Sequence, residues 1–221
     1  MEDRDTRGKI AHVIKTKLVA KRDVYKKTRE TFKLLKEVMT ATVKDLSVDT
    51  ADSGIEINCT DFSEFEARLK VGGDTLVFLM HSNVFHFDKS HKTRQNSYVK
   101  QDSMRGYCGQ IYVYNFLSDS FKHSRSNDLG YLVARIFVNK DLHYFVEGEK
   151  GLSFLFNDFV NSELTSAELQ KIVDEVLAYC LDFDMHTPPF NQVAVASVDQ
   201  ITVTSQELKL QTGKRLGFKF G

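Results

Sequence analysis

The chain has 221 residues, of which 42% are hydrophobic and 27% are charged. This balance is typical of a globular protein and excludes a disordered chain, and the length suffices for a large core without disulfides or metals as staples. The N-terminus is polar and charged, and no window approaches the ~18 consecutive apolar residues that a membrane span requires. We therefore expect no signal peptide, no membrane anchor and a cytoplasmic location.

The formal net charge is zero, but the charge is unevenly distributed along the chain. Residues 1–37 hold twelve Lys and Arg against six Asp and Glu, whereas residues 38–221 hold eighteen against twenty-four. A basic N-terminal arm thus precedes an acidic body. This asymmetry is compatible with contact to nucleic acid or to an acidic partner, and also with a solvated helix face docked on the protein's own body.

The three cysteines, Cys59, Cys108 and Cys180, are widely spaced and form no CxxC or Cys/His pattern. An odd number of cysteines in a chain of this length indicates free, buried thiols and a reducing compartment.

The N-terminal region, residues 5–47, contains no Pro and only one Gly and is expected to be helical. Semi-apolar residues follow one another in steps of three and four, which predicts a stripe along one helix face; they are Tyr25, Thr28, Phe32, Leu35, Met39, Val43 and Leu46. Ile10, Val13, Ile14 and Leu18 form a second stripe upstream. The polar junction Lys21-Arg22-Asp23 interrupts the rhythm, so one long helix and a helical hairpin both remain open. We divide the chain into a basic helical arm, 1–47, and an α+β body, 48–221, packed as one unit.

Beyond a linker at 47–54 the period changes to two, which indicates β-strands. Strands are predicted at 55–59, 65–71, 75–80 and 84–87, with a hairpin turn at Gly72-Gly73-Asp74. The polar stretch 88–105 is expected to be a long loop.

The second half of the chain predicts further strands and one long helix. Tyr107–Leu117 is apolar on both faces and is expected to be a central strand, followed by a polar connection and a hairpin of 131–138 with 142–147. Residues 152–156 predict one more strand. A helix begins near Thr165, which caps it together with Glu168. Final strands are expected at 193–195, 200–204 and 207–211. Helices at the ends of about six to eight mainly antiparallel strands describe an α+β fold.

The hairpin carries the strongest candidate site. A three-residue loop at Asn139-Lys140-Asp141 would pair Val138 with Leu142 and Ala134 with Val146, leaving one face uniformly apolar. The other face would hold Arg135 opposite Phe145, with His143 and Glu147 on its diagonals and Tyr131 nearby. Guanidinium, imidazole and carboxylate groups among aromatic rings can bind a small anionic or planar ligand, or act as general acids and bases. They can equally form an ordinary Arg135–Glu147 ion pair beneath a helix.

Three weaker patterns accompany the hairpin. The polar connection Asp119–Asp128 offers donors and acceptors at one end of the sheet, and it is also good turn chemistry. Two groups have some character of metal ligands, namely His81, His86 and His91 with Asp88, and Asp182, Asp184 and His186. Asp199 with Glu207-Leu208-Lys209 has the acidic-x-Lys form of a nuclease strand. None has the spacing of a complete metal site, so we expect no metal and no cofactor.

No GxGxxG, P-loop, GxSxG or HExxH motif occurs, so no motif specifies a reaction. The sequence favours a non-enzymatic binding or regulatory module that associates with itself or with another protein and holds a small anionic ligand at Tyr131, Arg135, His143 and Glu147. A metal-dependent hydrolase or nuclease is one alternative. A nucleic-acid-associated protein using the basic arm is another.

Overall fold

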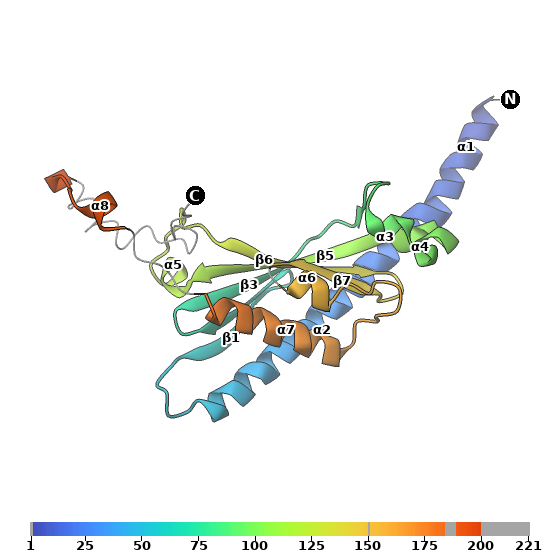
Figure 1. Ribbon diagram of the computed structural model, residues 1–221. Coiled ribbons are helices and arrows are strands. Elements are labelled where there is room, and N and C mark those ends of the chain that lie inside the picture. Colours follow the sequence, from blue (N-terminus) through green and yellow to red (C-terminus); the bar gives the residue numbers. More distant parts are fainter. Residues whose placement is uncertain (1, 150, 184–188, 200–221) are drawn as a thin grey trace.

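The computed structural model describes residues 2–149, 151–183 and 189–199. A seven-stranded antiparallel sheet stands at the centre, and two long helices lie against one of its faces (Figure 1). The expected α+β class is therefore confirmed.

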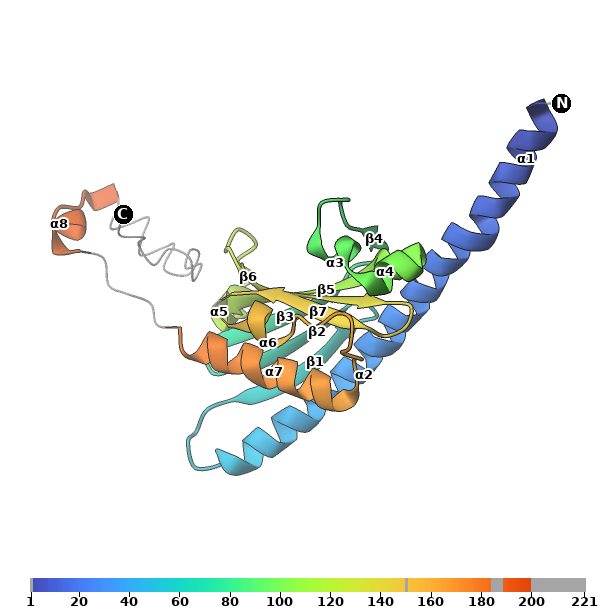
Figure 2. The same cartoon turned by 45° about the vertical axis from the view of Figure 1, so that its right-hand side comes forward.

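The N-terminal region is one continuous helix. It consists of α1 (Glu2–Val13), a π-helical segment (Ile14–Leu18) and α2 (Val19–Asp49). Of the two alternatives, the single long helix is the correct one. The junction at Lys21-Arg22-Asp23 stays helical because its three side chains are exposed or partly exposed and interrupt no buried contact. Residues 2–18, which we call the projecting segment, extend away from the body (Figure 2).

The sheet is an antiparallel meander. Its strand order is β1-β2-β3-β5-β6-β7, and β4 pairs with the start of β5. The strands are β1 (Ile57–Ser63), β2 (Glu66–Val71), β3 (Asp74–Met80), β4 (Phe85–His86), β5 (Tyr107–Leu117), β6 (Tyr131–Asn139) and β7 (Tyr144–Gly148). Strand β5 is central, as its two apolar faces predict. The β2–β3 turn uses Gly72 at φ +55°, a conformation that favours glycine.

The main core lies between the sheet and the helices α2 and α7 (Ser166–Leu181). Its fully buried side chains include Phe32, Leu35 and Met39 from α2, Leu69, Phe78, Ile111 and Ile136 from the sheet, and Leu169, Ile172 and Val176 from α7. Helix α2 crosses β5 closely at Gly109, because a Cβ there would lie 1.8 Å from Thr28 Oγ1. The predicted stripe of α2 and the apolar spacing of α7 thus face the same core.

The predicted pairing of the β6–β7 hairpin is wrong by two residues. Val138 pairs with Tyr144, and Arg135 pairs with Glu147, not with Phe145. The reason is a wider turn: Asn139 Oδ1 accepts hydrogen bonds from the backbone N–H groups of Asp141 at 2.9 Å and His143 at 3.0 Å. This side-chain cap extends the turn as far as His143. Because the shift is even, Ala134, Ile136 and Val138 stay on the apolar face with Tyr144 and Val146.

A smaller core lies on the opposite sheet face. The segment 85–106, which we call the cap segment, contains β4, α3 (Lys92–Gln95), α4 (Ser97–Gln101) and a 3-10 turn (Ser103–Gly106), so the predicted loop 88–105 is partly helical. Phe87 and Val99 from this segment pack with Phe137 and Phe145 of the hairpin. The cap segment covers only one end of this face.

Two predicted strands are not strands. Residues 152–155 form the short helix α6 (Leu152–Leu155), and of the predicted strand 193–195 only Val193 lies in an element, as the last residue of α8 (Phe190–Val193). Helix α6 follows β7 closely, and Ser153 Oγ accepts a hydrogen bond from the N–H of Gly148 and donates one to its carbonyl oxygen at the end of β7. The predicted strands 200–204 and 207–211 lie outside the described residues. Among the helices of the described part, none has the length and apolarity to cross a membrane.

Candidate functional site

The structure brings Arg135 and Glu147 together on the second sheet face. They are direct partners on β6 and β7, and the guanidinium and the carboxylate form an ion pair. The side chains are 40% and 32% exposed, so no helix of the described part covers the pair. The cation also lies over the ring of Phe137, 5.5 Å from its centroid. An Arg135–Glu147 ion pair is thus present, but in an open position.

This pair ends a straight row of side chains across five strands. Through successive register pairs, Glu66 faces Leu79, Leu79 faces Tyr112, and Tyr112 faces Arg135. Leu79 is 37% exposed and Tyr112 is half-buried. We call this row, together with its neighbours Arg68 and Tyr114, the uncovered face. The sequence predicts only that these residues lie on separate, alternating strands. The strand order and register place them side by side.

Aromatic rings surround the cations of the uncovered face. The guanidinium of Arg68 lies between the rings of Phe62 and Phe121, 4.1 Å from each centroid. Along β5, Tyr112 and Tyr114 stack with centroids 5.8 Å apart. Rings hold guanidinium groups by cation–π attraction without removing all of their N–H donors. The face is therefore preorganised and rich in aromatic and arginine side chains.

Tyr131 lies on the other side of the sheet. A β-bulge places Val133 as an extra residue in β6, because Val113 pairs with Ala134 and Tyr114 pairs with Leu132. One extra residue reverses which side chains point to each face. Tyr131 therefore enters the main core, where its hydroxyl accepts a hydrogen bond from Asn115 at 3.0 Å and burial raises its pKa.

His143 lies at the turn beneath the cap segment. Its ring stacks on Tyr98 with centroids 4.5 Å apart, and its Nδ1 is 3.0 Å from the carbonyl oxygen of Phe159. Tyr98 also donates to Asp141 at 2.8 Å, and burial raises its pKa to about 12. His143 thus helps to fasten the cap segment.

His91 lies near the Arg135–Glu147 pair, whereas the sequence pattern groups it with His81 and His86. It caps α3, stacks on Phe87 with centroids 4.5 Å apart, and places its Nε2 3.8 Å from Glu147 Oε1. The sequence around His91 does not predict this contact, because the two residues lie 56 positions apart in the chain. The imidazole, the carboxylate and the guanidinium of Arg135 therefore form one chain of ionisable groups.

The candidate metal ligands are not gathered. His81 packs edge-on against Phe85, His86 packs against Tyr107, and His91 stacks on Phe87, so each ring has a different environment. Asp184 and His186 lie outside the described residues, as do Glu207 and Lys209 of the nuclease pattern. Within the described ranges, no three His, Cys, Asp or Glu side chains are placed to hold a metal ion.

The polar connection Asp119–Asp128 contains α5 (Ser118–Lys122) and a turn. Ser120 donates to Asp128 at 2.6 Å, and Arg125 lies 3.6 Å from the same carboxylate oxygen. These groups line a hollow of about 360 Å³ with Phe116 and Phe121. The connection is thus built around an internal polar cluster at the end of the sheet.

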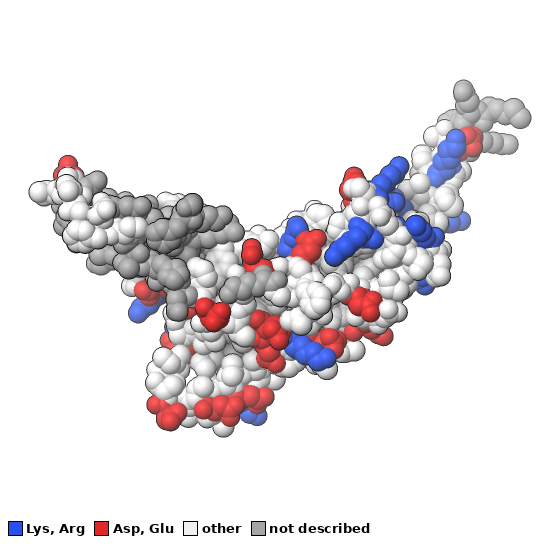
Figure 3. Space-filling model, viewed as in Figure 1, with Lys and Arg blue, Asp and Glu red and all other residues white. Residues whose placement is uncertain are grey.

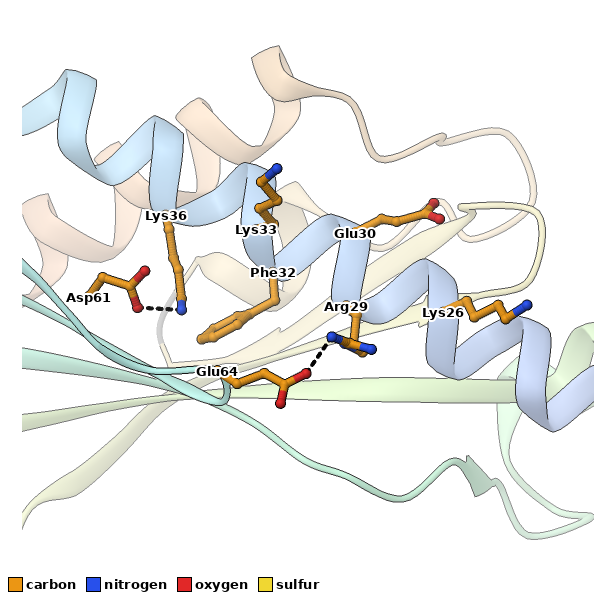
Figure 4. Close-up of a pocket in the computed structure, with 8 residues that line it drawn as sticks. All are labelled: Lys26, Arg29, Glu30, Phe32, Lys33, Lys36, Asp61 and Glu64. Carbon is orange, nitrogen blue, oxygen red and sulfur yellow. Dashed lines mark hydrogen bonds and ion pairs between the residues drawn. The ribbon is translucent and has the colours of Figure 1, made fainter.

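The basic side of α2 borders a groove of about 380 Å³ along the β1–β2 turn (Figure 4). Phe32 points into it, and the two innermost cations are paired: Arg29 with Glu64 and Lys36 with Asp61, each at 2.5 Å. Lys36 Nζ also donates to the carbonyl oxygen of Ser63 at 2.6 Å. We interpret the groove as the joint that fastens this turn to α2, because its inner cations already have partners.

The described cysteines are free thiols, as expected. Cys108 and Cys180 are buried, Cys59 is partly buried, and burial raises the pKa of all three. Their thiolate forms are disfavoured, which fits packing groups better than nucleophiles.

No family model, no curated protein and no solved structure matches this chain.

Proposed function

We propose that this chain is a binding module whose recognition surface is the uncovered face. The observation that carries this proposal is the row from Glu66 to Glu147, which leaves Leu79, Tyr112 and the Arg135–Glu147 pair accessible in the middle of a sheet. A central sheet face is normally covered by a helix or a second sheet. Here α2 and α7 cover one side only, and the cap segment covers one end of the other.

The partner that fits this surface is another protein. Interface cores are enriched in aromatic residues and arginine, and the uncovered face supplies both, with Tyr112 and Tyr114 beside Arg68 and Arg135. Its charges balance locally, since Arg135 pairs with Glu147 and Arg68 with Glu66. We therefore expect an apolar or aromatic anchor of the partner to contact Leu79 and Tyr112, while polar groups around it meet the two ion pairs.

A small anionic ligand is a second candidate, favoured by one observation. A hollow of about 260 Å³ borders Arg135, Glu147 and Ser153 at the edge of the hairpin. Arginine has five N–H donors, so a guanidinium that binds one carboxylate retains donors for a second anion. In this proposal the ligand carboxylate or phosphate would share Arg135 with Glu147.

The protein-binding proposal is tested by cross-linking and affinity capture with the whole chain. Leu79→Lys places a charge in the centre of the surface, beside Glu66, and Val48→Lys places the same charge on the exposed end of α2, where Val48 is 72% exposed. We expect a partner that cross-links next to Tyr112 and that is lost with Leu79→Lys but kept with Val48→Lys. Equal capture by both variants would contradict the proposal.

The ligand proposal is tested separately by titration calorimetry with benzoate and with inorganic phosphate. Binding by the native chain that disappears in Arg135→Met supports it. Binding that is unchanged in this variant assigns the anion to another site.

A further inference from the structure

The projecting segment carries an apolar stripe that faces solvent. Ile10, Val13, Ile14 and Leu18 are 44–54% exposed, although their spacing of three, one and four residues is that of a helix-packing face. Residues 2–18 hold five Lys and Arg against three Asp and Glu, and all three acidic residues lie within residues 2–5. At ~1.5 Å per residue, residues 2–18 form a basic amphipathic rod roughly 25 Å long.

The body has a groove of complementary character between α6 and α7. It has a volume of about 400 Å³, and Leu152, Leu155, Ala178 and Tyr179 supply its apolar lining. Three acidic residues, Glu149, Glu175 and Asp182, border the same groove. Leu155 is 54% exposed, and its neighbour Phe154 is 80% exposed. Figure 3 shows acidic side chains across the lower body and basic ones along the projecting segment.

We propose that the projecting segment of one copy binds the α6–α7 groove of a second copy. An amphipathic helix recognises a groove through apolar residues at positions such as i, i+3, i+4 and i+7, which is close to the spacing of Ile10, Val13, Ile14 and Leu18. The flanking lysines and arginines then meet Glu149 and Glu175. This inference is independent of the uncovered face, because it uses neither its residues nor its partner.

The occupant is a second copy because the segment cannot reach its own groove. The helix is continuous from residue 2 to residue 49, and α2 is fixed to the sheet, so the projecting segment points away from the body (Figure 2). Direct pairing of two projecting segments is disfavoured, since it would bring their basic stretches together. A reciprocal exchange of segments gives a closed two-fold dimer.

The charge arrangement predicts how association depends on salt. Opposite charges at an exposed interface attract less when salt is added, whereas two like-charged helices would pair better. We expect light scattering of the full chain to give a dimer mass at about 50 mM salt. At about 500 mM salt, the dissociation constant of the dimer should be about tenfold higher or more. A monomer mass at every concentration and at low salt would overturn the proposal.

Two single variants locate the helix face involved. Ile14→Asp places a carboxylate in the centre of the stripe, and His12→Asp places it roughly opposite on the same exposed helix. We expect Ile14→Asp to raise the dissociation constant at least tenfold and His12→Asp to leave the dimer intact. Circular dichroism should show unchanged folding, because both residues are exposed. Equal effects of the two variants would contradict the use of this face.

A charge swap identifies the groove as the partner. Replacing Glu149 and Glu175 by Lys should weaken the dimer, as should replacing Lys15 and Lys17 by Glu, and the combination of all four changes in one chain should restore much of the association. Asp49→Lys with Asp52→Lys, at the far end of α2, is the matched control and should have no effect. If the groove variant keeps the native dimer, or if the combined chain stays monomeric, the segment does not bind this groove.

If the chain is instead monomeric and its projecting segment binds duplex DNA at low salt, the basic residues serve to bind nucleic acid and the proposal is wrong.

Discussion

Arg135 and Glu147 are direct cross-strand partners whose side chains join in an ion pair at the end of a row that crosses five strands. Both groups are partly exposed, and the ring of Phe137 lies beside the guanidinium. The pair therefore rests on the sheet surface and does not replace a hydrophobic contact of the main core. This position determines how much the fold depends on it.

Arg135→Met should leave the protein folded. Partly exposed ion pairs contribute about 0.2–1 kcal/mol, and the methionine side chain can keep the contact with Phe137. We expect the free energy of unfolding in urea to fall by about 1 kcal/mol or less, with a similar value for Glu147→Gln and a coupling energy below about 1 kcal/mol in the double variant. A loss of about 3–5 kcal/mol would show that the pair is buried in solution.

Gly109→Ala should be strongly destabilising. A Cβ at this position would lie 1.8 Å from Thr28 Oγ1 and 2.7 Å from Thr28 Cβ, so α2 would have to move away from β5. Overpacking of this kind typically costs about 1–3 kcal/mol or more. Thr28→Ala in the same chain removes the closest atom and should restore part of the loss.

The matched control for this variant is Gly73→Ala, where a Cβ would meet no atom within 4 Å. It should change the free energy of unfolding by about 0.5 kcal/mol or less. Similar denaturation midpoints for Gly109→Ala and Gly73→Ala would contradict the close approach of α2 to β5.

Lowering the pH should remove the contribution that the Glu168 carboxylate makes to the free energy of unfolding. Hydrogen bonds from Lys171 at 2.6 Å and from the buried Tyr144 hydroxyl at 2.7 Å hold the pKa of this carboxyl below its ordinary value of 4.5. A carboxyl with a lowered pKa in the folded state stabilises the fold above its ordinary pKa, and this contribution is lost as the pH falls through the lowered value. Thermal unfolding followed from pH 7 downward should therefore lose less stability below about pH 4.5 in Glu168→Gln than in the native chain.

Tyr144→Phe separates the hydrogen bond from the packing of the ring. It should lower the free energy of unfolding by about 1–2 kcal/mol at neutral pH, since the Glu168 carboxylate loses the hydroxyl that donates to it while the ring stays buried. Tyr25→Phe, at a half-buried position of α2, is the control and should cost less.

An identical acid transition in the native chain and in Glu168→Gln would show that this carboxyl does not contribute.

Local patterns were sufficient for most of the fold. The spacing from Thr28 to Met39 predicts the buried side of α2, and the alternation on either side of Gly72-Gly73 predicts the β2–β3 hairpin. These features depend on neighbours in sequence, where helical and strand periods are visible. The strand predicted at 152–156 failed because a short apolar run does not distinguish a strand from a helical turn.

The candidate site depended on information that local patterns do not contain. Arg135 and Glu147 were predicted as neighbours, but Tyr131 was placed on their face because the bulge at Val133 leaves no alternation signal. The Asn139 cap shifted the register in the same hidden way. The approach of His91 to Glu147 requires the cap segment to fold back over the sheet, which no pattern within that segment encodes.

Tyr98→Phe should loosen the cap segment without unfolding the body. The Tyr98 hydroxyl donates to Asp141 at 2.8 Å and accepts from Asn139 Nδ2 at 3.1 Å, so the variant removes two hydrogen bonds between α4 and the β6–β7 turn. The stack on His143 and the Arg105–Asp141 ion pair at 3.1 Å remain.

We expect backbone amides of residues 92–106 to exchange with deuterium about five- to thirtyfold faster, which corresponds to about 1–2 kcal/mol of local opening. Amides of α2 and α7 should keep their native rates. Tyr112→Phe is the matched control, because no hydrogen bond of the Tyr112 hydroxyl occurs within the described residues. Uniformly faster exchange through α2, α7 and the sheet would show that the cap segment opens only with the whole fold.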